Sequence, residues 1–191
     1  MVNPTGSRRR KHRCAPRGDV RRAEHVIYGR VEANTDAVVR FLDGCTMSGI
    51  DAAVLRIVDS PGGHVDDAQR MHAAVLKARR AGVHVSCLLE GRCFSATALV
   101  PLASDCTIAR PEAKWLVHNA SGDASGTAAQ IERGLREIRF ADIEVSLAYM
   151  AATGCSISFI RARMSEGKTM TATEALRAGY VDHVDDERLA R

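Results

Sequence analysis

The chain has 191 residues, 46% of them hydrophobic and 26% charged, which is ordinary for a globular protein and long enough for one well-buried domain but not two. No run approaches the roughly 20 apolar residues of a membrane helix, and the N-terminus lacks the apolar segment of a secretory signal, so neither membrane binding nor export is expected. The formal net charge of +4 arises in residues 1–24, which hold eight Lys or Arg and two acidic residues.

Residues 1–24, rich in Arg, Pro and Gly, predict a disordered basic leader, and residues 25–191 predict a single domain. The basic run could bind nucleic acid, in which case affinity would fall steeply with salt. No aromatic or fold motif for nucleic acid accompanies it, so a solvated leader is the favoured interpretation.

The six cysteines are scattered and form no C-x-x-C pair; they lie at positions 14, 45, 87, 93, 106 and 155. Several fall in apolar runs, where a free cysteine behaves as a small hydrophobe. We therefore expect no disulfide framework, no metal site and no cofactor, and the reducing cytoplasm as the location.

Strand and helix signals alternate along the chain, which favours an α/β fold around a mostly parallel sheet. The expected strands are 26–31, 51–58, 83–89, 106–109 and 115–118. The expected helices are 37–42, 65–78, one that opens at Ser95, 127–152, 157–164 and 173–179. The strand 51–58 is apolar on both faces apart from Arg56, as expected for a sheet covered on both sides.

The helix expected over 127–152 begins with a capping-box sequence, Thr127-Ala-Ala-Gln130. A stripe with Ile131 and Leu135 is joined after Phe140 by a second apolar stripe. A helix that is apolar on more than one side needs a further cover, which is either another subunit or the domain's own active cleft.

Ser95 lies where Gly91-Arg-Cys-Phe-Ser95 turns from an apolar run into a helix. The free amides of a helix start can stabilise negative charge near such a hydroxyl, although most serines at these corners are helix caps. The turn Ser60-Pro-Gly-Gly63 follows a strand, and its paired glycines allow backbone amides to face a ligand. His118 ends another apolar strand, where an imidazole is more often structural than catalytic.

In this order, Ser-Pro-Gly-Gly (60–63), Gly-x-x-x-Ser (91–95), His118 and Thr-Ala-x-Glu-Ala-x-x-x-Gly-x-Val-Asp (171–182) resemble the Clp protease proteolytic-subunit family. The resemblance spans roughly residues 26–185. It implies the Clp/crotonase fold, with repeated ββα units and a protruding "handle" helix at 127–152 through which rings of subunits meet.

The resemblance also implies roles for individual residues. Ser95 would be the nucleophile, His118 the general base, and the amides of Gly63 and Ala96 the oxyanion hole. The substrate-binding positions would be Gly62, Asn119 and Ala120. The expected partners are a peptide or unfolded protein as substrate, further copies in a homo-oligomeric ring, and a Clp-type ATPase.

One position departs from the family pattern. The aspartate that completes the family's triad lies five residues before the alanine that matches Ala172, and this chain has Gly167 there. Glu166 is adjacent and is the expected substitute, and Asp123 is a more distant one. Without an acid, a Ser–His pair retains part of the activity.

Three alternatives remain beside an active serine peptidase. A catalytically impaired subunit would keep the fold and the ring contacts, and the missing aspartate motivates this alternative. An acyl-CoA enzyme of the crotonase type would share the fold and the paired amides without needing Ser95 and His118. The third is nucleic-acid binding through residues 8–22.

Overall fold

Two sheets with helices around them make up the computed structural model, which describes residue 14 and residues 20–185. The strands are β1 (Arg22–Tyr28), β2 (Ala52–Asp59), β3 (His84–Leu89), β4 (Arg92–Phe94), β5 (Cys106–Ala109), β6 (Lys114–Leu116), β7 (Met170–Thr171) and β8 (His183–Val184). The α-helices are α1 (Thr35–Met47), α2 (Val65–Arg80), α3 (Leu99–Leu102), α4 (Ala128–Thr153), α5 (Ile157–Glu166) and α6 (Ala172–Ala178), with 3₁₀ turns η1 (Val31–Ala33) and η2 (Ser95–Ala98).

The larger sheet has the strand order β1-β2-β3-β5-β8, and every neighbouring pair in it is parallel. Helices connect its strands, because parallel neighbours need a crossover. The expected α/β class with a mostly parallel sheet is confirmed.

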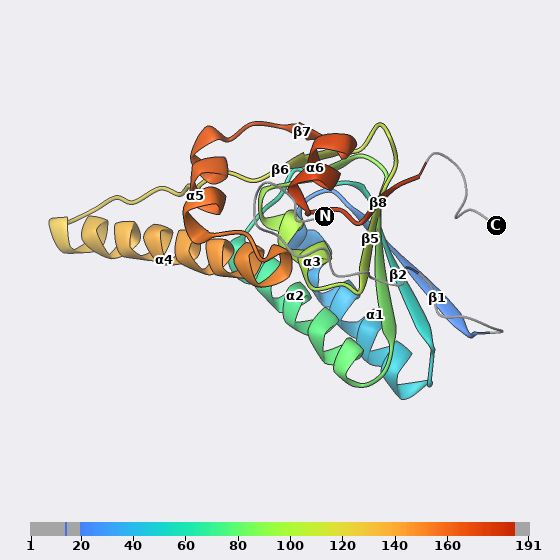
Figure 1. Ribbon diagram of the computed structural model, residues 1–191. Helices are drawn as coiled ribbons and strands as arrows, with labels where there is room; N and C mark the ends of the chain where they lie inside the picture. The colour runs from blue at the N-terminus through green and yellow to red at the C-terminus, as the bar shows by residue number, and fades with distance from the viewer. Residues whose placement is uncertain (1–13, 15–19, 186–191) are drawn as a thin grey trace.

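Helices cover the two faces of this sheet unequally. Helices α1 and α2 lie along one face, as Figure 1 shows. On β2 the side chains of Leu55 and Ile57 are fully buried, whereas the alternating Val54 and Arg56 are only half-buried. Arg56 pairs with carboxylates of two neighbouring segments, Glu24 at 2.9 Å and Glu90 at 2.8 Å. The expectation of a sheet covered on both sides was therefore wrong on the face that carries Arg56.

The smaller sheet has the order β4-β6-β7 and packs above the first. Strands β4 and β6 are parallel and pair Phe94 with Leu116. An isolated bridge between Ser60 and Cys93 joins β4 to the end of β2. The chain segments that follow β2, β4 and β6 thus leave the sheets near one another.

Helix α4 begins with the predicted capping box of Thr127 and Gln130, and one end of it projects far from the body (Figure 1). Tyr149 anchors its other end, because the tyrosine is fully buried and its hydroxyl accepts a hydrogen bond of 3.0 Å from the Trp115 indole. Six large apolar side chains of the helix are exposed, at Ile131, Leu135, Phe140, Ile143, Leu147 and Met150.

The start of the chain differs from the expectation in two ways. Strand β1 begins at Arg22, inside the segment expected to be disordered; the rest of residues 1–24, apart from Cys14, Val20 and Arg21, lies outside the described residues. Cys14 forms a disulfide with Cys106, so the expectation that the cysteines are free was wrong for this pair. The two cysteines are 92 positions apart in the sequence, which gave no spacing signal, and only the folded chain brings Cys14 next to β5.

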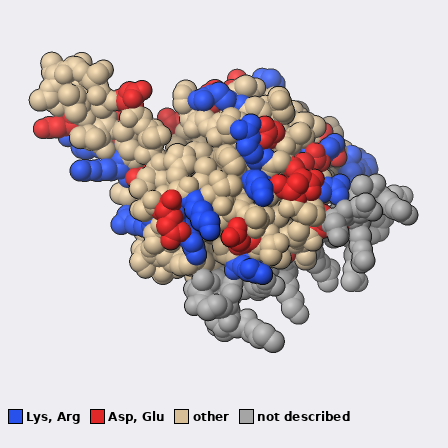
Figure 2. All heavy atoms as spheres, turned by 90° about the horizontal axis from the view of Figure 1, so that it is seen from above, with Lys and Arg blue, Asp and Glu red and all other residues tan. Residues whose placement is uncertain are grey.

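No helix within residues 20–185 is both long and apolar enough to cross a membrane. On the face drawn in Figure 2, basic and acidic side chains are interspersed, and neither sign forms a continuous field. The predicted nucleic-acid run at residues 8–22 falls mostly outside the described residues.

Candidate active site

Ser95 has the backbone conformation of a sharp strand-to-helix corner. It follows β4 directly and begins η2 with φ of 55°, the single positive value at a non-glycine position among the described residues. Such a conformation costs of order 1–3 kcal/mol and persists only where the surrounding structure enforces it. The side chain is half-buried, and its hydroxyl makes no hydrogen bond with any described residue. The hydroxyl of Ser95 is therefore not a helix cap.

Gly62 packs directly against this corner. A β-carbon at Gly62 would lie 2.6 Å from the Ser95 Cβ and 3.1 Å from the carbonyl oxygen of Phe94, and φ at this glycine is 106°. Only glycine allows both this backbone conformation and so close an approach. The Ser60-Pro-Gly-Gly63 turn and the Ser95 corner thus form one unit.

Two further contacts hold this unit together. The buried hydroxyls of Ser60 and Thr97 hydrogen-bond at 2.6 Å, which explains a threonine two residues after the serine. The Arg92 guanidinium donates two hydrogen bonds to Asp59, of 2.7 and 2.6 Å. The Arg92 guanidinium lowers the pKa of the Asp59 carboxyl.

The two predicted oxyanion-hole residues border the same corner. Ala96 is the second residue of η2, where amides have no partner within the helix. The Gly63 amide donates no hydrogen bond to any residue that the structure describes. Both amides are thus available to a ligand oxygen.

Glu32 is a neighbour of Gly63 that sequence reasoning missed. A β-carbon at Gly63 would collide with its carboxylate, which also accepts a hydrogen bond of 3.4 Å from the His64 amide. The hydrogen bond from Arg30 is the main cause that lowers the pKa of Glu32 to about 2. Nothing in the spacing of these residues could reveal the contact, because it depends on how η1 packs on the turn.

His118 emerges at the same edge as Ser95. Strands β4 and β6 are parallel, and their last pair is Phe94 with Leu116. Ser95 lies one residue after Phe94, and His118 lies two residues after Leu116. The His118 Nδ1 atom is 2.6 Å from the carbonyl oxygen of Asn119. A carbonyl only accepts, so this contact places the proton on Nδ1 and leaves the Nε2 lone pair free. No hydrogen bond joins His118 to Ser95 in the described part of the chain.

Among the described residues, no carboxylate forms a hydrogen bond or ion pair with the His118 imidazole. A β-carbon at Gly167 would stand 3.7 Å from the His118 Cβ, so the family's aspartate position does border the histidine. Glu166, the expected substitute, instead accepts a 2.7 Å hydrogen bond from Arg163 and makes none with His118. Asp123 is exposed.

The two predicted substrate-binding residues after His118 are held by neighbouring helices. The Asn119 amide donates to the Met164 carbonyl at the end of α5, at 3.2 Å. The Ala120 amide donates to Asp142 of α4, at 2.5 Å. These contacts hold the segment after His118 against the C-terminal end of α5 and the middle of α4, and they occupy two amides that an added peptide strand could otherwise use.

Comparison with known proteins supports the fold and identifies a family. A family model described as Clp protease matches residues 27–188. The solved structure of a ClpP1 mutant from Listeria monocytogenes is similar, with a TM-score of 0.76 and 21% identity, over 86% of this chain and 92% of that chain. At this identity the structural likeness supports the fold alone.

Proposed function

Because the chain belongs to the Clp protease family, we propose that it is a serine-type endopeptidase with Ser95 as nucleophile and His118 as general base. One observation carries the proposal: a serine with positive φ and a histidine leave the same edge of the β4-β6 pair, beside a glycine turn packed on the serine.

The imidazole is set up to accept a proton. With Nδ1–H donated to the Asn119 carbonyl, Nε2 takes the proton of Ser95 while Oγ attacks the peptide carbonyl carbon. The imidazolium then returns this proton to the leaving amine, and the acyl-enzyme is hydrolysed by water through the same steps. A rotation or small movement of either side chain is required first, since apo hydrogen bonds at such sites are often long.

The amides of Gly63 and Ala96 would hold the oxyanion of the tetrahedral intermediate. Loss of one such donor typically costs roughly 3–4 kcal/mol of transition-state stabilisation. The Glu32 carboxylate near Gly63 repels the negative charge of the oxyanion, so the two amide hydrogen bonds to the oxyanion are more important in this chain. Substrate would lie along Gly62, Asn119 and Ala120.

A catalytically impaired subunit is the second candidate function, and Gly167 is the observation that favours it. The orienting carboxylate usually contributes on the order of 10⁴ to the rate of a serine–histidine pair. Here a neutral backbone carbonyl takes its place at Nδ1. A carbonyl fixes the tautomer but stabilises the imidazolium less than a carboxylate does, so a slow enzyme is expected.

We propose a homo-oligomeric ring as the assembly, because one side of α4 leaves apolar side chains exposed. A Clp-type ATPase partner and a cytoplasmic location follow from the family resemblance alone. The Cys14–Cys106 disulfide removes the cysteine-based argument for a reducing compartment.

Labelling with a fluorophosphonate tests the proposal, since this reagent phosphonylates a serine hydroxyl only when a base activates it. We expect mass spectrometry to find the label on Ser95, with no label in Ser95→Ala and labelling slowed by several orders of magnitude in His118→Ala. Absence of labelling in folded wild-type protein at high reagent concentration would contradict an active serine peptidase and support the catalytically impaired subunit. Binding of CoA would instead support the alternative of an acyl-CoA enzyme of the crotonase type.

A further inference from the structure

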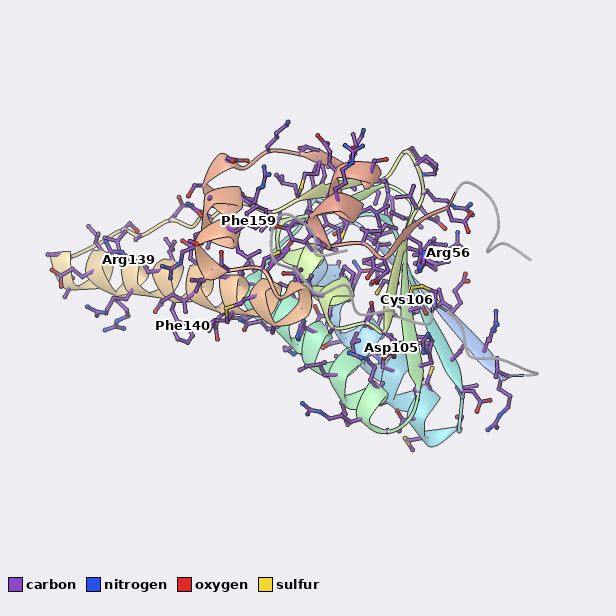
Figure 3. The ribbon with its side chains drawn as sticks, viewed as in Figure 1. Arg56, Asp105, Cys106, Arg139, Phe140 and Phe159 are labelled. Carbon is purple, nitrogen blue, oxygen red and sulfur yellow. A yellow bond between two sulfur atoms is a disulfide. The ribbon has the colours of Figure 1, made fainter. Side chains whose placement is uncertain are left out.

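Three side chains with metal-binding atoms meet on one side of the larger sheet, and none of them belongs to the candidate active site. They come from three parts of the chain: Cys14 near the start, Cys106 of β5 and His183 of β8. The two sulfurs and one imidazole nitrogen all lie within 4.8 Å of one another. Figure 3 shows the disulfide as a yellow bond beside the Cys106 label.

The register of the sheet explains why this cluster forms. His183 pairs with Ile108, two residues after Cys106, and Cys106 itself pairs with Ser86 of β3. Because side chains alternate along a strand, Ser86, Cys106 and His183 point from the same face. The Ser86 hydroxyl donates to the carbonyl of Cys14 at 3.4 Å, which holds the third member over that face.

A disulfide alone does not account for the imidazole. His183 is exposed and forms neither a hydrogen bond nor an ion pair with any described residue. A hollow of about 230 Å³, bordered by Cys14 and Ile108, lies beside the cluster and gives water access. Two thiolates and one imidazole are a donor set typical of Zn²⁺, which accepts water as a fourth, tetrahedral ligand.

We propose that Cys14, Cys106 and His183 bind one Zn²⁺ ion when the disulfide is reduced, and that oxidation of the two thiolates by a small-molecule disulfide, which is itself reduced to two thiols, releases the ion. A thiol reductant supplies two electrons and two protons, the S–S bond breaks, and two cysteine thiols form while two reductant thiols become a disulfide. Zn²⁺ then displaces both thiol protons and binds the neutral imidazole. The disulfide thus links Cys14 to β5, and the metal ion would link it to both β5 and β8.

The test uses the full-length protein, stripped of metal and either reduced with a phosphine under anaerobic conditions or left oxidised. Zn²⁺ is titrated against a chromophoric chelator, and Co²⁺ is used to detect thiolate-to-metal charge-transfer absorption. We expect one equivalent of Zn²⁺ to bind the reduced protein and none to bind the oxidised protein. Absence of binding to the reduced protein, or equal binding in both states, would overturn the proposal.

Variants assign the ligands. Cys14→Ser, at the partly buried position, should retain the fold and abolish thiolate-dependent Co²⁺ absorption; Cys106→Ser should do the same where circular dichroism shows it folded. His183→Ala should weaken Zn²⁺ binding at least tenfold, whereas His64→Ala and Cys45→Ala serve as controls and should not change it. Unchanged affinity in Cys14→Ser or in His183→Ala would contradict the three-ligand site.

Discussion

Gly167 borders His118: a β-carbon on this glycine would lie 3.7 Å from the histidine Cβ, at the position where the family's triad aspartate is expected. The contact arises because α5 ends at Gly167 in a left-handed conformation and because the Met164 carbonyl holds the Asn119 amide. The structure therefore places a glycine, which has no carboxylate, directly beside His118.

Gly167→Asp should raise the peptidase rate, because a carboxylate beside the imidazole stabilises its protonated form. The full effect of such an acid elsewhere is about 10⁴, and we expect at least about tenfold here. The left-handed φ of 55° costs Asp little relative to other residues. The matched control is Gly167→Asn, which carries the same shape without the charge. A gain of equal size in both variants would show that charge is not the cause.

Gly62→Ala should abolish turnover while the protein stays folded. The new methyl would meet the Ser95 Cβ and the Phe94 carbonyl, so the corner must move, and a displacement of about 1 Å can cost 10²-fold in rate. Gly82→Ala is the control, because Gly82 also has positive φ but nothing lies within 4 Å of its added β-carbon. It should lose about 1–2 kcal/mol of unfolding free energy and keep its kcat. Equal rates in the two variants would contradict the Gly62–Ser95 contact.

Glu166→Gln should leave kcat and kcat/KM within about twofold of wild type, because the carboxylate pairs with Arg163 and not with His118. Since both side chains are substantially exposed, loss of the ion pair should change the unfolding free energy by less than about 1 kcal/mol. Arg163→Gln breaks the same pair from the other side and should behave alike. If Glu166→Gln lowers the rate more than tenfold and Arg163→Gln does not, the Glu166 carboxylate takes part in the mechanism.

Thiol reagents should not inactivate the protein through Cys93, although it lies two residues before Ser95. Burial raises the pKa of the Cys93 thiol well above its usual range. At pH 7–8 the thiol is therefore protonated, and the reactive thiolate is absent. Incubation with iodoacetamide at pH 8, followed by activity assay and peptide mapping, should show full activity and no label at Cys93. Inactivation that Cys93→Ala prevents would refute this account.

Leu147→Asp or Phe140→Asp should reduce the oligomer to smaller species. Phe140 is 60% exposed on α4 and points away from the body in Figure 3, so its apolar area needs a partner. Arg139→Asp introduces the same residue at a neighbouring polar, exposed position and is the control. Size-exclusion chromatography with light scattering measures the mass. If both apolar variants keep the wild-type mass, this face of α4 is not the interface.

The sequence alone determined the alternation of strands and helices and the capping box at Thr127, because these depend on local periodicity and on residue-specific backbone preferences. The order of the sequence motifs also indicated Ser95 and His118 as candidate site residues. The packing of Gly62 on Ser95, the contact of Glu32 with Gly63 and the Cys14–Cys106 disulfide were decided only by the tertiary structure. Each depends on the register of neighbouring strands or the docking of one element on another, which residues distant in sequence determine together.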